Sequence, residues 1–191
     1  FQARFVGGSV RDRLLGIVPK DFDIAADAKP DEVIALLTSH KIKTIPTGID
    51  HGTVTAVMPT SQIEITTLRE DVVSYGRHAQ VKFGSDFKKD AKRRDFTMNA
   101  MYEDKNGKVY DYFSGKNHLK EKKIFFVGDP KVRIKEDYLR ILRFFRFKSR
   151  FSLHADTNTL NAIAGLKDGL TSISQERKTK ELEDLFVTPQ A

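Results

Sequence analysis

The sequence predicts an α+β protein, with a mixed sheet and flanking helices over residues 1–115 and an all-helical domain over residues 116–191. Two observations predict this division. Segments of alternating apolar residues, typical of strands, recur between helix-like segments up to about residue 113 and then stop. Positive charge is concentrated just beyond that point, because residues 116–150 hold seven Lys and five Arg against four acidic residues, whereas the formal charge of the whole chain is +7.

Composition limits the class of protein. The 191 residues suffice for one large or two small domains. The sequence has no Cys, no signal-peptide pattern and no apolar run near the length of a membrane span, so we expect a cytoplasmic protein without a membrane anchor or disulfide framework. The positive charge favours an anionic partner, nucleic acid first. Because Phe1 already belongs to a strand-like segment, we expect a fragment of a longer protein, and the oligomeric state stays open.

The first functional candidate is a glycine turn. Residues 4–6 are predicted to form a buried strand that leads into Gly7, Gly8 and Ser9, and residues 10–15 a short helix. Glycines let the backbone approach a ligand closely, and a helix start offers free N–H groups to a phosphate. Arg11 could reach such a phosphate. The alternatives are an ordinary turn and an exposed salt bridge from Arg11 to a neighbouring carboxylate.

A pair of carboxylates follows the turn. Asp21 and Asp23 flank Phe22 on a predicted strand over residues 21–25, so both carboxylates face one way and Phe22 faces a core. Two close carboxylates repel unless a cation lies between them, and Mg²⁺ suits oxygen ligands. Such a pair is often solvated surface. Beside a phosphate-binding turn, however, it predicts phosphoryl or nucleotidyl transfer.

The rest of the first part is predicted as a helix over residues 30–37, strands over 53–58 and 62–68, and a hairpin at Asn106-Gly107. If the second of these strands neighbours the strand of Asp21, Glu64 is a third carboxylate for the metal site; otherwise it is an ordinary outward-facing residue. Residues 70–92 lack sustained periodicity and are predicted to form a long mobile loop, which is often a functional lid.

Residues 92–101 surround apolar side chains with Arg94, Asp95 and Asn99. This pattern suits a helix start that positions a nucleotide, with Arg for a phosphate and Asn for a sugar hydroxyl or base. A capped helix with a basic entry is the alternative.

Residues 135–151 predict one long helix, followed by helices over residues 160–166 and from about residue 174. At about 100° per residue, Asp137 and Arg140 share a face of the long helix, while Arg143 and Arg146 lie further round. A carboxylate beside a guanidinium could recognise the edge of a base. The alternative is a solvated salt bridge.

Five motifs follow one another along nearly the whole chain: Phe5–Asp12 with Leu14-Leu15-Gly16, Lys20–Ile24, Arg93–Ala100, Glu136–Arg140 with Arg143 and Arg146-Phe147, and Ile173–Arg177 with Glu181-Leu182. In this order they resemble the motifs of the class II tRNA nucleotidyltransferase and bacterial poly(A) polymerase family.

The resemblance implies a polymerase-β-like head domain followed by a helical neck. Asp21 and Asp23 would hold two Mg²⁺ ions, one activating the 3′-hydroxyl of an RNA primer and the other orienting the triphosphate. Gly8, Arg11 and Arg94 would contact the nucleotide. Asp137 and Arg140, with Arg143 and Arg146 nearby, would recognise CTP or ATP, so that protein side chains replace a nucleic-acid template. Residues 70–92 match a flexible loop that helps the family switch from C to A addition.

The choice within the family rests on two segments. His51-Gly52-Thr53-Val54 resembles the CCA-adding members, whereas the loop lacks the usual Pro after Arg77, which leaves room for a partial CC- or A-adding enzyme or a poly(A) polymerase. The implied partners are CTP, ATP and the 3′ end of tRNA. A nucleotidyltransferase for small molecules and an RNA-binding module with a degenerate site are the alternatives from other classes.

Overall fold

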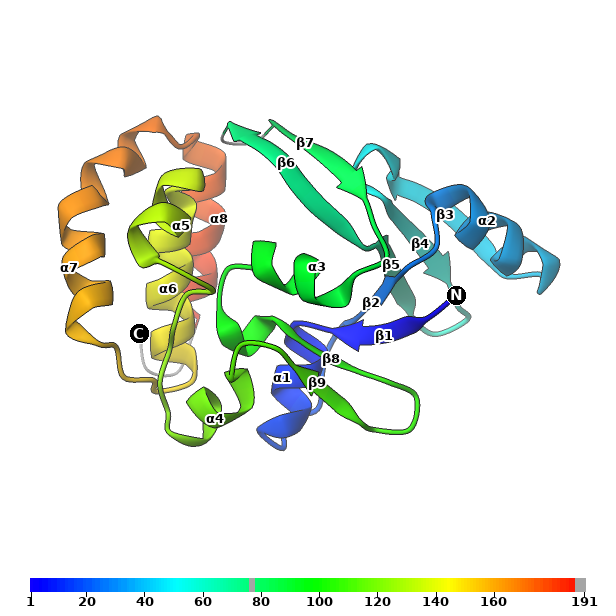
Figure 1. The fold of residues 1–191 in the computed structure, drawn as a ribbon, viewed down its shortest axis with the longest axis horizontal. Helices are drawn as coiled ribbons and strands as arrows, with labels where there is room; N and C mark the ends of the chain where they lie inside the picture. The colour runs from blue at the N-terminus through cyan, green and yellow to red at the C-terminus, as the bar shows by residue number, and fades with distance from the viewer. Residues whose placement is uncertain (76–77, 188–191) are drawn as a thin grey trace.

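Seven strands form one mixed sheet in the order β3-β4-β5-β2-β1-β8-β9 (Figure 1). The computed structural model describes residues 1–75 and 78–187. The strands of this sheet are β1 (Ala3–Val6), β2 (Phe22–Ala26), β3 (Lys43–Gly48), β4 (Thr53–Val57), β5 (Gln62–Thr67), β8 (Met101–Glu103) and β9 (Val109–Asp111). The predicted mixed sheet is thereby confirmed.

Strand pairing brings the predicted functional strands to the middle of the sheet. β2 lies between β1, to which it is antiparallel, and β5, to which it is parallel. On the far side of β1, β8 pairs antiparallel and continues through the predicted hairpin at Asn106-Gly107 into β9. Gly107 has a φ of 82°, which suits this tight turn.

Helices flank the sheet and then make up the second part of the chain. α1 (Gly8–Leu14), α2 (Pro30–Ser39) and α3 (Phe87–Arg93) accompany the strands. The later helices are α4 (Gly115–Lys120), α5 (Pro130–Glu136), α6 (Leu139–Arg150), α7 (Thr157–Leu166) and α8 (Gln175–Phe186). Figure 1 shows α5 to α8 gathered on one side of the sheet, as the predicted all-helical segment requires. Among the described residues, no helix combines the length and apolar content needed to cross a bilayer.

A shared core, to which Met101 of β8 belongs, joins the sheet to the helical part. Phe96 lies beside Phe126 and Phe147, with ring centroids 4.8 and 5.6 Å apart, and Phe126 stacks on Phe144 of α6 at 6.1 Å. Phe96 and Phe144 are both fully buried. Burial of large aromatic side chains is among the strongest stabilising contributions to a core. The position of α6 relative to the sheet is therefore fixed by packing.

A second cluster lies under α3. Val6, Ala25 and Tyr102 of the sheet pack against Phe87 and Ala91 of this helix. Because side chains alternate along a strand, Asp23 faces the same side of the sheet as Ala25. The α3 side of the sheet is thus the face that carries this carboxylate.

The predicted mobile loop over residues 70–92 is wrong for the described residues. A two-stranded antiparallel hairpin, β6 (Arg69–Tyr75) and β7 (His78–Phe83), is followed by α3. The register of the hairpin shifts between Asp71 and Val73, and such a shift interrupts the alternation by which a strand is recognised. The loop feature at Gly76 and Arg77 lies outside the described residues.

The predicted long helix over residues 135–151 is also wrong, because the chain breaks at Asp137. This residue has extended φ and ψ of −155° and 106° between α5 and α6. Its Oδ1 accepts a hydrogen bond from the backbone N–H of Leu139, 3.1 Å away. Aspartate side chains compete in this way with helical backbone bonds, so Asp137 ends one helix and starts the next.

Two smaller predictions also need correction. Arg94 follows the last residue of α3 and is not at a helix start; Thr97–Asn99 form one 3₁₀ turn after it. Phe22 does not point into a core: it is 38% exposed, and its ring meets the edge of Phe5 at 5.9 Å.

Candidate active site

Parallel pairing of β2 and β5 places Asp23 and Glu64 directly side by side as register partners. Side chains at paired positions of neighbouring strands share one face of the sheet, so the two carboxylates face the same side. Asp21 lies one residue before β2, and all three residues are exposed to solvent. The predicted condition for Glu64, that its strand neighbours the strand of the aspartates, is therefore fulfilled.

The charged groups around Asp23 shift its pKa in opposite directions. Although Asp23 is in contact with solvent, partial burial of its carboxyl raises the pKa, the charge of Glu64 raises it further, Arg94 lowers it, and Asp21 adds a smaller increase. A raised carboxyl pKa means that the folded protein disfavours the negative charge at Asp23. A cation bound between the carboxylates would offset this penalty by compensating their negative charge.

This donor set fits a hard divalent cation. Carboxylate oxygens are the ligands that Mg²⁺ prefers, and the like charges at Asp23 and Glu64 supply the electrostatic reason to bind one. Within residues 1–75 and 78–187, no three His, Cys, Asp or Glu side chains converge as a complete protein cage. Mg²⁺ commonly keeps several waters and binds through one or two carboxylates plus substrate phosphates, so an open pair remains suitable.

The glycine turn lies next to Arg94, the cation that acts on Asp23. Gly7 has a φ of 72°, a backbone conformation that residues other than glycine rarely adopt. A Cβ added there would lie 3.4 Å from Nη1 of Arg94. The hydroxyl of Ser9 is buried and donates to the Val6 carbonyl at 3.2 Å. The turn, Arg94 and the carboxylates therefore form one local constellation.

Arg94 is held by a buried carboxylate. Its Nε lies 3.2 Å from Oδ2 of Asp90 and 3.3 Å from the Tyr102 hydroxyl, which itself donates to Asp90 at 2.6 Å. Burial disfavours the charge of the Arg94 guanidinium, but Asp90 and Tyr102 outweigh it and raise the pKa of Arg94. Arg94 thus stays cationic beside Asp23.

Acid should destabilise the protein through Asp90. Burial raises the pKa of this carboxyl, but Arg94 and Arg93 lower it more, so its folded-state pKa lies below the unfolded value of about 3.9. Its contribution to the free energy of unfolding is therefore complete above pH 4 and is lost as pH falls through the folded-state pKa. In urea unfolding from pH 7 to pH 3, Asp90→Asn should lose most stability at pH 7 and progressively less below pH 4. A deficit that does not change with pH would contradict this.

Arg11 is not exposed as its salt-bridge alternative assumed. It is 4% exposed, donates from Nε to Asp12 at 2.8 Å and from Nη1 to Asn99 at 2.7 Å, and lies over the Phe151 ring at 4.6 Å. Burial lowers the pKa of the Arg11 guanidinium, and Asp12 partly restores it. These contacts occupy Arg11 in joining α1 to the helical part.

Asp95 continues the same polar network. Arg143 of α6 donates from Nε and Nη2 to Oδ2 of Asp95 at 2.9 and 2.6 Å, and Asn99 donates to Oδ1 at 3.2 Å. Burial raises the pKa of Asp95, but Arg143 lowers it more, so the carboxylate is ionised. On α8, Glu181 pairs with Arg143 at 3.3 Å and with Arg146 at 2.8 Å. Arg143 and Arg146 therefore link α6 to α8.

Asp137 and Arg140 do not form the predicted pair on one helical face. Oδ2 of Asp137 accepts from Arg177 of α8 at 2.8 Å. Arg140 donates to Glu136 at 2.6 Å and to the Arg133 carbonyl at 2.7 Å. Among the described residues, no hydrogen bond or ion pair joins the two side chains, and each is held by a different partner.

Sequence reasoning assigned no role to several of these partners. Asp90, Arg133 and Glu136 are among them, as are Arg177 and Glu181. The spacing of four residues between Glu136 and Arg140, and between Asp90 and Arg94, was a usable signal of ion pairs on a helix. Arg177 and Glu181 meet partners 40 and 38 residues away in the chain, which spacing cannot reveal.

Comparisons with known proteins agree with this geometry. The human protein "CCA tRNA nucleotidyltransferase 1, mitochondrial" is 47% identical over an alignment of 190 residues, which covers 97% of this chain and 44% of the human protein. The "CCA-adding enzyme" of Staphylococcus epidermidis is 40% identical over 98% of this chain and 46% of its own length. The chain therefore spans less than half of the curated relatives that it matches.

Solved structures give the same result. The Bacillus stearothermophilus CCA-adding enzyme in complex with CTP superposes with a TM-score of 0.90 at 39% identity, covering 98% of this chain and 45% of that one. A tRNA nucleotidyltransferase complexed with a primer tRNA and an incoming ATP analog has a TM-score of 0.79 at 30% identity, covering 95% of this chain and 52% of that one. The polymerase-β-like head fold and the resemblance seen in the motifs are confirmed. Residues 3–125 match the sequence model of the "Poly A polymerase head domain", and the chain belongs to this family.

Proposed function

We propose that the protein is a template-independent RNA nucleotidyltransferase that adds C and A, from CTP and ATP, to the 3′ end of tRNA. The observation that carries this proposal is the register pairing of Asp23 and Glu64 beside the Gly7 turn and Arg94, in a chain similar over nearly its whole length to CCA-adding enzymes. A partial CC- or A-adding enzyme and a poly(A) polymerase are the alternatives within the family.

The proposed division of labour follows the two parts of the chain. Residues 1–115 form the catalytic head, and residues 116–191 form a neck that recognises the nucleotide. Proteins of this family use divalent metal ions. We assign two Mg²⁺ ions to Asp21 and Asp23, with Glu64 as a third carboxylate. The predicted cytoplasmic location remains a prediction, since the human relative is named as mitochondrial.

In the proposed reaction, the 3′-oxygen of the RNA bonds to the α-phosphorus of the nucleotide. The bond from the α-phosphorus to the bridging oxygen of pyrophosphate breaks, and the proton of the 3′-hydroxyl passes to solvent. Metal ions held by Asp21 and Asp23 would lower the pKa of that hydroxyl and stabilise the charge on the leaving pyrophosphate. Arg94, kept cationic by Asp90, contributes positive charge on the phosphate side of the site. The Gly7 turn permits the close approach of the nucleotide.

Base recognition is assigned to the helical part. Asp137 supplies acceptors and Arg140 supplies donors, which are the complementary groups that a base edge requires. Arg177 donates to Asp137, and Glu136 accepts from Arg140, so each of these two side chains has a defined orientation before a nucleotide binds. Arg143 and Arg146 are proposed as nearby cations whose positions Glu181 fixes.

Incorporation of labelled nucleotides tests the proposal. The chain is given CTP and ATP, separately and together, with tRNA transcripts that end before CCA, after C and after CC. Addition of C, C and then A is the expected result. C without A, A only on the CC-ended transcript, or long A tails on unrelated RNA would each select a different family member. Absence of any incorporation with Mg²⁺ present would contradict the proposal.

A further inference from the structure

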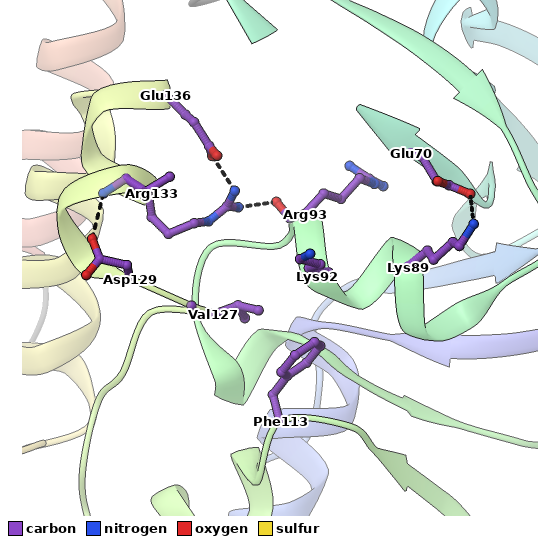
Figure 2. A pocket seen from close by; sticks show the side chains of 11 residues that line it. Glu70, Lys89, Lys92, Arg93, Phe113, Val127, Asp129, Arg133 and Glu136 are labelled. Atoms are coloured by element: carbon purple, nitrogen blue, oxygen red, sulfur yellow. Dashed lines mark hydrogen bonds and ion pairs between the residues drawn. The ribbon is translucent and has the colours of Figure 1, made fainter. Parts of the chain in front are cut away.

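A cavity of about 560 Å³ lies between α3 and α5, with Glu70 of β6 at its rim (Figure 2). Its lining contains no residue that the sequence assigned to metal or nucleotide, although Arg93 precedes Arg94 and Glu136 precedes Asp137. This volume lies within the range of about 300 to 1,000 Å³ typical of small-ligand sites. The cavity is therefore large enough for a ligand of its own.

The acidic side chains of the cavity are already engaged. Glu70 pairs with Lys89 at 3.0 Å, and Glu136 pairs with Arg133 and Arg140. Asp129 accepts from the backbone N–H of Val132 at 3.0 Å at the start of α5. These carboxylates are neutralised or hydrogen-bonded locally, which leaves the cationic side chains to decide what the cavity attracts.

Two donor groups of the lining residues have no hydrogen-bond partner in the described part of the chain. Lys92 is exposed, and no partner for its ammonium is found in the described part of the chain. Arg133 is 7% exposed; its Nη2 donates to the carbonyls of Arg93 and Arg94, but its Nε is buried and has no hydrogen-bond partner among the described residues. Because the Nε of Arg133 has almost no solvent-accessible surface, a ligand in the cavity would meet Lys92 rather than this donor.

The remaining lining is apolar. In Figure 2, Phe113 lies below α3 and Val127 lies beside it, and Val132 of α5, a large apolar residue, is 56% exposed. An aromatic ring with aliphatic neighbours offers a surface on which a planar base can stack. An unpaired ammonium beside such a surface complements a phosphate.

We propose that this cavity binds one nucleotide unit outside the active site, with its phosphate at Lys92 and its base against Phe113 and Val132. The same chemistry is supplied by a nucleotide within a single-stranded RNA and by a free nucleoside triphosphate. The first source rests on the proposed function, because it makes the cavity a contact for the RNA upstream of its reacting end.

Binding measured with a short fluorescein-labelled single-stranded RNA tests the first source, and equilibrium dialysis with labelled CTP tests the second. Lys92→Ala removes the free cation. Lys88→Ala is the matched control, since Lys88 is also exposed on α3 but does not line the cavity. Val132→Asp adds a negative charge at an exposed position without removing a core residue.

We expect Lys92→Ala and Val132→Asp to weaken RNA binding by about threefold to tenfold, and Lys88→Ala to leave it unchanged. Loss of one phosphate contact should also reduce the slope of log K against log salt by about 0.7, a change that a merely structural effect would not produce. Unchanged RNA affinity with one fewer CTP bound per chain would identify a free nucleotide as the ligand.

Equal binding of RNA and CTP by the Lys92→Ala, Lys88→Ala and parent proteins would overturn the inference. That result would leave the proposed function intact, because the latter is tested by incorporation and not by affinity. Conversely, failure of incorporation with a Lys92-dependent salt slope would reject the activity and retain the binding site.

Discussion

Replacing Asp23 with Asn is expected to lower nucleotide incorporation by at least about a thousandfold, which corresponds to about 4 kcal/mol of transition-state stabilisation. The amide keeps the size of the side chain but removes the negative charge that would hold a divalent cation beside Glu64. Initial rates with labelled CTP and a tRNA transcript measure the effect.

The same substitution should leave the fold intact. Because the pKa of Asp23 is raised in the folded protein, its ionised form lowers stability at neutral pH, and Asn should be neutral or slightly stabilising. Asp31→Asn is the matched control, as Asp31 is exposed in the first turn of α2. Incorporation that survives in Asp23→Asn at the level of this control would remove Asp23 from the catalytic site.

Arg143→Ala should lower the free energy of unfolding by about 2 to 4 kcal/mol. The substitution leaves the largely buried Asp95 carboxylate with Asn99 and the Phe96 N–H as its remaining partners. An uncompensated buried charge is destabilising, and burial would then raise the pKa of Asp95. Urea unfolding at pH 7 should therefore show the full deficit, and unfolding at lower pH a smaller one as Asp95 takes up a proton.

Arg150→Ala is the control for this prediction. Arg150 ends the same helix and is exposed, and its nearest carboxylate oxygen, on Asp12, is 3.8 Å away. Exposed ion pairs contribute about 0 to 1 kcal/mol, so this variant should lose little. Equal losses in the two variants would show that the Asp95–Arg143 contact is no stronger than a surface pair.

The central strands could be predicted because their sequences alternate. β4 and β5 were expected within one residue of their observed ends, and adjacency of β2 and β5 was enough to bring Glu64 to Asp23. β3 was missed because Pro46 interrupts it, and proline is tolerated mainly in edge strands, which is where β3 lies. Local pattern thus identified the candidate carboxylates but not the edge of the sheet.

The candidate nucleotide-binding residues were harder to place, because their partners are distant in the chain. Arg11 was expected near a phosphate, yet it is buried by Phe151 and Asn99, which belong to other elements of the fold. Asp137 was placed on a helical face, whereas its own side chain breaks the helix and meets Arg177. Such outcomes depend on tertiary contacts, which a periodicity within one segment does not contain.

Pyrophosphate release measured together with RNA extension tests the central claim most directly. With Mg²⁺, CTP and a tRNA transcript that lacks its 3′ CCA, the protein should release one pyrophosphate for each nucleotide added, and omission of the RNA should abolish the release. Pyrophosphate release without RNA extension would indicate another acceptor, and nucleotide binding with neither product would contradict the assignment of Asp21 and Asp23 as catalytic carboxylates.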